Sequence, residues 1–244
     1  YISADIPLDS VGLGIVGMLP PIAFAVSGLV APMVARRLGL ELVIVLACAA
    51  MVVGPVVRAV AGSYAVLVLG SVIVLGGMGF ANILLPPAVK KYFPDRIGQL
   101  TSLYATIMAI SASIPALIAA PVAAAAGWRV SVGMWALLAL FALAPWLAVW
   151  LRSRREARVS DESISLEAEP ELVGRMWHSR VAWAMALTFG FTSLNVYALF
   201  AWLPEILRDD SGMTSVEAGG LLFLYAVIGL PFALLVPIIV TRLR

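Results

Sequence analysis

Residues 84–104 read LLPPAVKKYFPDRIGQLTSLY, and this short charged stretch separates two long apolar blocks of the chain. In a soluble protein such a segment would be an ordinary surface loop. The rest of the composition is not that of a soluble domain, because 62% of the 244 residues are hydrophobic and only 12% are charged. Soluble domains carry about 25% charged residues. A chain with a mean hydropathy of +1.03 is therefore expected to have lipid as its solvent.

The same composition excludes several classes of protein. A net charge of +2 is too small to indicate a nucleic-acid partner. One cysteine, Cys48, and one histidine, His178, cannot supply an intrachain disulfide or a metal site. A membrane enzyme would need histidines, cysteines or carboxylates clustered near one membrane surface, and the acids concentrate instead in the polar stretch 152–179. We therefore expect no enzyme activity, no metal and no cofactor.

The apolar blocks are long enough to cross a membrane as helices, which takes about 20 mainly apolar residues each. None alternates apolar and polar residues in the manner of a barrel strand, so all are predicted to be helical. The stretch 152–179, basic and then acidic, is typical of a solvated linker. The predicted fold class is all-α, a polytopic transmembrane helix bundle. Its seven spans lie at 11–35, 40–61, 64–89, 98–125, 130–151, 181–203 and 216–240.

The basic residues predict the orientation of these helices. If the loop with Arg36 and Arg37 is cytoplasmic, all but three of the 16 Lys and Arg residues lie on the cytoplasmic side. Such asymmetry follows the positive-inside rule. We therefore expect a multi-pass protein of the inner (plasma) membrane, with the linker in the cytoplasm and residue 1 on the outer side. The three exceptions are Arg58, Arg129 and Arg208.

The first and last spans repeat one another. A shift of 205 residues superposes them, including the polar start, a late proline and the basic end. Parallel repeats are a mark of transporters built from two similar helix bundles. The matched residues are Asp5, Ser10, Val11, Gly14, Leu19, Leu29, Pro32, Arg37 and Leu38, on Asp210, Ser215, Val216, Gly219, Leu224, Leu234, Pro237, Arg242 and Leu243.

The repeat also predicts the domain organisation. In the second copy, the span 181–203 precedes the superposed region. In the first copy, residue 1 corresponds to the end of that preceding span, so the span itself has no counterpart in the sequence. Residues 1–151 are therefore expected to form an N-terminal bundle of five spans that lacks its first helix. Residues 152–179 then form the linker, and residues 180–244 the first two helices of a C-terminal bundle.

Four stretches resemble those of a known family: APMVARRLGLE at 31–41, NILLPPAVKKYFPDR at 82–96, GWR at 127–129 and YALFAWLPEILRD at 197–209. The chain resembles the major facilitator superfamily, and more narrowly its cyanate and 2-nitroimidazole transporter branch, as helices two to eight of the usual twelve. The resemblance implies alternating-access transport of a small solute, such as the anion cyanate, without a need to oligomerise. The alternatives are an exporter of nitroimidazole-like or other small drugs, and a fragment with no activity by itself.

The resemblance assigns Arg36, Arg37 and Gly39 to the superfamily's loop motif between its second and third helices. The acidic residue that usually precedes the basic one is replaced by Arg36, so the usual gating salt bridge is not expected. We also expect no Asp or Glu to lie within any of the seven spans. Since carboxylates inside the bilayer are the usual proton relays, proton coupling would then need groups on other helices.

Seven residues are candidates for contact with the solute, and each has a structural alternative. Arg58, near the expected outer end of its helix, either attracts an anion or extends to the lipid headgroups. The Asn82 amide binds the solute or a neighbouring helix. Tyr104 faces the cavity or packs against a backbone partner. The span 181–203 supplies Thr192, Asn195 and Trp202 on one face and Tyr197 with Ser193 on another, and Trp202 alternatively marks the membrane interface.

Overall fold

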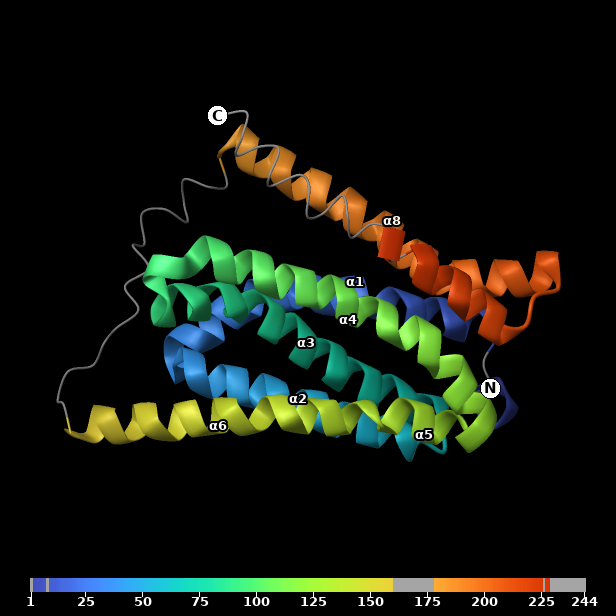
Figure 1. The fold of residues 1–244 in the computed structure, drawn as a ribbon, viewed down its shortest axis with the longest axis horizontal. Coiled ribbons are helices and arrows are strands. Elements are labelled where there is room, and N and C mark those ends of the chain that lie inside the picture. Colours follow the sequence, from blue (N-terminus) through green and yellow to red (C-terminus); the bar gives the residue numbers. More distant parts are fainter. Residues whose placement is uncertain (1, 8, 160–177, 226, 229–244) are drawn as a thin grey trace.

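The computed structural model describes residues 2–7, 9–159, 178–225 and 227–228. All regular secondary structure in these residues is helical, which confirms the predicted all-α class (Figure 1). The helices are α1 (Ser10–Leu38), α2 (Leu40–Ala59), α3 (Tyr64–Tyr92), α4 (Ile97–Ala126), α5 (Trp128–Gly133), α6 (Trp135–Val159) and α8 (Arg180–Ser211), with 3-10 turns η1 (Ile2–Ala4) and η2 (Pro94–Arg96) and a further helix over Ser215–Tyr225.

Six of these helical segments are long and apolar enough to cross a membrane. They coincide with the first six predicted spans. The seventh predicted span, 216–240, is described as an apolar helix only over Ser215–Tyr225, and residues 229–240 lie outside the described part of the chain. The described residues thus form an incomplete membrane-type helix bundle.

Two helices continue beyond the membrane spans predicted for them. The fifth predicted span is covered by the short α5, which begins at Trp128, and by α6, which starts at Trp135; Met134 between them keeps helical backbone angles. Helix α6 then continues to Val159, into the predicted linker, because charged residues do not end a helix that leaves the lipid; Arg154 covers the Trp150 ring at 4.7 Å there. Helix α8 continues past residue 203 to Ser211, where Gly212 in the left-handed conformation caps it.

Close packing of small residues fixes the central helices. A Cβ atom placed on Gly77 of α3 would lie 2.6 Å from the Ala47 carbonyl oxygen of α2, and one on Gly79 would lie 2.4 Å from the Ser27 hydroxyl of α1. Only glycine permits such close approach of neighbouring helices. A buried apolar cluster also joins α1, α2 and α3, and includes Ala31, Ile44 and Leu84. Helix α6 packs along α2, and α8 lies across the opposite side of the bundle, in contact with α1 (Figure 1).

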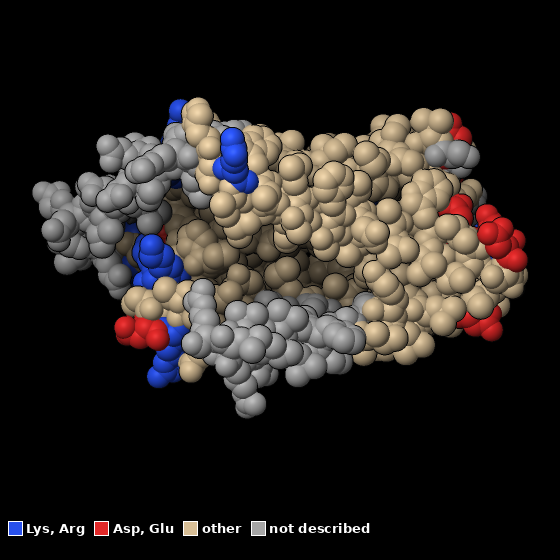
Figure 2. Space-filling view, turned by 90° about the horizontal axis from the view of Figure 1, so that it is seen from above, with Lys and Arg blue, Asp and Glu red and all other residues tan. Residues whose placement is uncertain are grey.

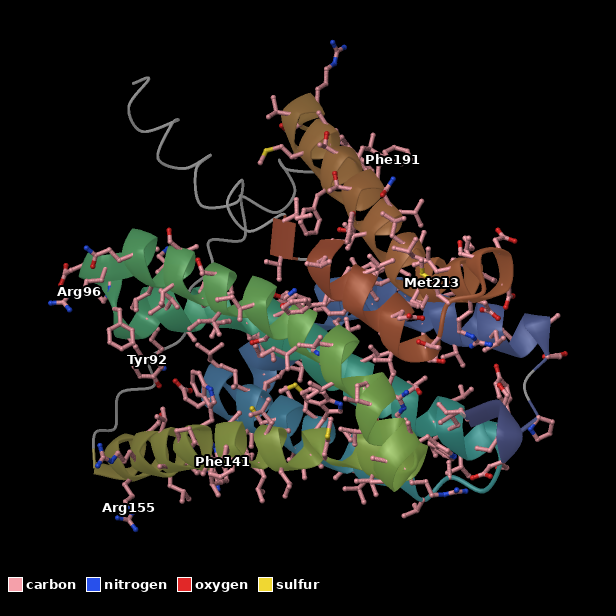
Figure 3. The ribbon with its side chains drawn as sticks, turned by 45° about the vertical axis from the view of Figure 1, so that its right-hand side comes forward. Tyr92, Arg96, Phe141, Arg155, Phe191 and Met213 are labelled. Atoms are coloured by element: carbon pink, nitrogen blue, oxygen red, sulfur yellow. The ribbon has the colours of Figure 1, made fainter. Side chains whose placement is uncertain are left out.

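The charged residues gather at the two ends of the bundle (Figure 2). At the basic end, α1 meets α2 and α3 meets α4; Tyr92, Arg96 and Arg155 lie there, whereas Met213 lies at the opposite, acidic end (Figure 3). This separation agrees with the pattern used to predict the orientation. The side of the membrane that each end faces stays a prediction. The acidic end includes Asp5, Asp9, Asp209 and Asp210.

Candidate substrate cavity and the clusters at the helix ends

A cavity of about 520 Å³ lies between α1, α3 and α8. This volume is in the range of small-molecule sites, which are mostly apolar and carry a few placed polar groups. The cavity joins a helix from the far side of the linker to two helices of the first 151 residues. Its lining residues are Pro21, Phe24 and Ala25 of α1, Asn82 of α3, and Ala186, Leu187, Phe189, Gly190, Phe191, Ser193, Leu194 and Tyr197 of α8.

The chemistry of the cavity is that of an aromatic pocket with neutral polar groups. The Phe24 and Tyr197 rings face one another across α1 and α8, with their centroids 6.2 Å apart and their planes at 37°. Such tilted pairs are a favourable arrangement of aromatic rings. The Asn82 amide and the Ser193 hydroxyl add hydrogen-bonding groups, and no charged side chain is among the described residues that line the cavity.

The structure brings together two of the predicted solute-binding residues, Asn82 and Tyr197. The sequence separated α8 into two polar faces but could not tell which one meets α1 and α3. The face with Ser193 and Tyr197 lines the cavity, and the face with Thr192, Asn195 and Trp202 does not. Phe24 was not predicted, because a phenylalanine in an apolar span carries no distinguishing signal in one sequence.

The hydroxyl of Thr192 already has a backbone partner. It donates to the Thr188 carbonyl at 2.8 Å, and the Thr188 hydroxyl donates to the Ala184 carbonyl at the same distance. Threonine hydroxyls in helices commonly bond the carbonyl four residues earlier. Asn195 is exposed and Trp202 is 48% exposed, which suits contact with lipid or with parts of the protein outside the described residues.

Tyr104 and Arg58 lie away from the cavity. Tyr104 is half-buried on α4. Arg58 is in the last turn of α2, and its side-chain stem crosses α3 at Gly70, where a Cβ atom would lie 2.7 Å from the Arg58 Cγ. The buried Nε of Arg58 has no hydrogen-bond partner among the described residues. The roles of both residues in solute binding stay predictions.

Beside the loop motif at the basic end lies an acid that sequence reasoning missed. Gly39, with φ of 87°, is the single residue between α1 and α2, and Arg36 and Arg37 are exposed beside it. Two residues further on, the Glu41 carboxylate accepts hydrogen bonds from Lys91 Nζ at 2.5 Å and from the Tyr92 hydroxyl at 2.7 Å.

The expectation that no Asp or Glu lies within the spans was wrong, because Glu41 lies in the predicted span 40–61. Glu41 belongs to the first turn of α2, and its side chain is only 8% exposed. Because Lys91 and Tyr92 end α3, the carboxylate ties the beginning of one helix to the end of the next. The sequence feature that could have indicated this ion pair is Glu41, at the end of the stretch 31–41, together with Lys91 and Tyr92 in the stretch 82–96. The two stretches had been interpreted separately.

A second cluster, at the acidic end, joins the start of the described chain to the corner between α4 and α5. The Trp128 indole donates to the Asp5 carboxylate at 2.9 Å, and the Arg129 guanidinium donates to the same oxygen. These two donors, Trp128 first, hold the pKa of Asp5 below its ordinary value. Trp128 itself is buried, so it packs inside the bundle at this corner.

A bundle of membrane-length helices, with a cavity between α1, α3 and α8, is the architecture of a polytopic membrane protein. The chain belongs to the Major Facilitator Superfamily, whose family model matches residues 1–244. The resemblance stated from the sequence motifs is thereby confirmed at the level of the superfamily.

Two curated relatives agree with this assignment. The chain is 29% identical over 245 residues to "Uncharacterized transporter YycB" of Bacillus subtilis (strain 168), a match that covers all of the chain. It is 31% identical over 238 residues, 97% of the chain, to "2-nitroimidazole transporter" of Escherichia coli (strain K12). Both relatives are named as transporters. The chain spans 58% of the length of each.

Proposed function

We propose that the full-length protein is a secondary transporter that moves a small solute across the membrane by alternating access, with the cavity between α1, α3 and α8 as part of its binding site. The observation that carries the proposal is the position of Asn82, Tyr197 and Phe24 around one cavity. These residues come from both sides of the 152–179 linker. A cavity that is shared between two helix groups is opened and closed when the groups move against one another.

The lining favours a neutral, planar aromatic solute with hydrogen-bonding groups. Phe24 and Tyr197 supply ring faces, and Asn82 supplies both a donor and an acceptor. A nitroimidazole-like compound has this chemistry, and one relative is named for 2-nitroimidazole. Cyanate is the second candidate. Its support is Arg58, a half-buried cation whose Nε is unpaired among the described residues.

The location follows from the charge at the helix ends. With the basic end in the cytoplasm, the loop of Arg36 and Arg37, the end of α3 and the end of α6 all obey the positive-inside rule. We therefore place the full-length protein in the inner (plasma) membrane, with the linker cytoplasmic. Reaction of a membrane-impermeant maleimide with Gln99→Cys, at the start of α4, would report the side; labelling from outside intact cells would contradict it.

Transport by the full-length protein in proteoliposomes tests the site. The substrates are radiolabelled 2-nitroimidazole and cyanate, each measured with the parent protein and with Asn82→Ala and Tyr197→Leu. We expect both variants to lose most of the 2-nitroimidazole transport. The controls are Gln99→Ala, which removes an exposed amide, and Phe141→Leu, which shortens an aromatic side chain that is 79% exposed on α6.

The two candidate solutes give different results. If Arg58→Gln abolishes cyanate transport while Asn82→Ala leaves it unchanged, cyanate is the solute and the cavity assignment is wrong. Parental transport of both compounds in Asn82→Ala and Tyr197→Leu would also refute the cavity as the binding site. Absence of any transport by the parent protein would refute both solutes.

A further inference from the structure

Helix α3 contains two adjacent prolines, Pro86 and Pro87, one turn beyond the Asn82 that lines the cavity between α1, α3 and α8. Proline has no amide hydrogen, so the backbone carbonyls four residues earlier, those of Asn82 and Ile83, lack their usual helical donor. In lipid, such a freed carbonyl needs a donor from a neighbouring helix, a side chain or water. The proline pair therefore creates two hydrogen-bond acceptors within a membrane-length helix.

Of these two carbonyls, that of Asn82 lies on the cavity side of α3. Residues four apart share a face of a helix, so this carbonyl points along α3 toward Pro86 on the face that carries Asn82. Both residues are exposed within the described bundle. The ring of Pro86 also crowds the carbonyl and turns it outward. Ile83 packs instead against the buried cluster of α1, α2 and α3, so its carbonyl belongs to the other side of the helix.

The remaining polar groups of the cavity differ from this carbonyl in their chemistry. The Asn82 amide and the hydroxyls of Ser193 and Tyr197 have no hydrogen-bond partner among the described residues. By contrast, the Thr188 and Thr192 hydroxyls, on the other polar face of α8, donate to their own helix. An amide or a hydroxyl both donates and accepts, so it adapts to either kind of solute group. The freed backbone carbonyl only accepts, and it therefore selects for a donor.

We propose that the transported solute carries a ring N–H and donates it to the backbone carbonyl of Asn82, which makes Pro86 the residue that sets this specificity. The proposal rests on the proposed function, because it concerns a solute bound in the same cavity. An azole ring combines an N–H with a flat aromatic face, whereas the cyanate ion has no hydrogen to donate. The ring packs beside Phe24 and Tyr197, whose centroids are 6.2 Å apart and leave no gap for a third ring.

Analogues of the solute test the N–H without any change to the protein. Transport of radiolabelled 2-nitroimidazole by the full-length protein in proteoliposomes is measured against unlabelled 2-nitroimidazole, 1-methyl-2-nitroimidazole or 2-nitrothiazole. The methyl compound replaces the hydrogen by a larger group, and the thiazole replaces the N–H by a ring sulfur without an added substituent. We expect both analogues to need about tenfold higher concentrations for half-inhibition, since they leave the acceptor unpaired. Half-inhibition by either analogue at the concentration of 2-nitroimidazole would mean that water satisfies the carbonyl and would overturn the proposal.

The adjacent prolines provide a matched pair of variants. Pro86→Ala supplies an amide that closes the helical bond to the Asn82 carbonyl, so the preference for the N–H compound should fall below about twofold. Pro87→Ala closes the bond to Ile83, away from the cavity, and should keep the preference of the parent protein. A merely structural effect of losing a proline would lower transport without changing this ratio. An unchanged ratio in Pro86→Ala, or an equal loss in both variants, would contradict the role of Pro86.

The same measurements separate this proposal from the proposed function. If Asn82→Ala and Tyr197→Leu lose 2-nitroimidazole transport while all three compounds inhibit the parent protein equally, the cavity is the binding site and the N–H requirement is wrong. If those two variants transport like the parent protein, or the parent protein transports no 2-nitroimidazole, the proposed function is wrong and this proposal is overturned with it.

Discussion

Lys91 in the last turn of α3 donates to Glu41 in the first turn of α2 over 2.5 Å, so that one carboxylate ties together two helix ends that are 50 residues apart in sequence. The Tyr92 hydroxyl donates to the same oxygen at 2.7 Å. Because the Glu41 side chain is only 8% exposed, little water can replace either donor.

Removal of one partner should leave this carboxylate buried and poorly compensated. We expect Lys91→Met to lower the free energy of unfolding by about 1–3 kcal/mol, the range for a hydrogen bond to a charged group. Unfolding can be followed through Cys48, a buried free cysteine that becomes reactive to a thiol dye when the bundle opens. The neighbouring Lys90→Met is the matched control. Equal melting temperatures for the two variants would show that the ion pair contributes nothing.

The cluster at the acidic end should make stability depend on pH. The pKa of Asp5 is held below its ordinary value of 3.8 by the hydrogen bonds from Trp128 and Arg129. A group whose pKa is lowered by folding stabilises the protein above the ordinary value, and this stabilisation is lost as the pH falls through the lower, folded pKa. We expect the melting temperature of the parent protein to decrease as the pH falls from 3.8 through the lower pKa of folded Asp5. In Asp5→Asn, the part of this decrease that comes from Asp5 should be absent.

The control for this measurement is Asp209→Asn, which neutralises an exposed acid on α8 at the same end of the bundle. It should leave the acid-induced fall intact. If Asp5→Asn and Asp209→Asn follow the parent curve equally, the Asp5 cluster is not the origin of the pH dependence.

Glycines 76 and 77 offer a matched test of helix packing, since they are adjacent on α3. A Cβ atom on Gly77 would lie 2.6 Å from the Ala47 carbonyl oxygen, whereas one on Gly76 meets nothing within 4 Å among the described residues. Gly77→Ala must separate α2 from α3 and should cost about 1–3 kcal/mol of unfolding free energy. Gly76→Ala should be neutral or stabilise by up to about 1 kcal/mol, because alanine is the better helix former. Similar melting temperatures would contradict the close approach.

Hydropathy predicted the bundle because each helix must bury about 20 apolar residues in lipid whatever its neighbours are. The locations of six spans followed from that requirement alone. The continuation of α6 to Val159 and of α8 to Ser211 did not, since hydropathy measures preference for lipid and not where a helix ends. Helix ends depend on local capping and on contacts such as Arg154 over Trp150.

The candidate site was only partly predictable for a related reason. Periodicity showed that Ser193 and Tyr197 share a face of α8, and composition showed that Asn82 is polar within an apolar span. In the structure, all three residues line the same cavity. Choosing between the two faces of α8 required its position against α1. Glu41 was overlooked because its partners are 50 residues away, and one sequence does not show which distant charges meet.

The last contact with a functional consequence joins α4 to the Ser215–Tyr225 helix on the other side of the linker. A Cβ atom on Gly219 would lie 2.5 Å from the Ala116 carbonyl oxygen of α4, whereas one on the adjacent Gly220 meets nothing within 4 Å among the described residues. If the two helix groups rock against one another during transport, a side chain at Gly219 should hold them apart and disfavour states that bring these helices together. We expect Gly219→Ala to reduce transport turnover several-fold in proteoliposomes and Gly220→Ala to leave it near the parent level. Equal turnover in the two variants, at equal amounts of folded protein, would show that this contact does not limit the transport cycle.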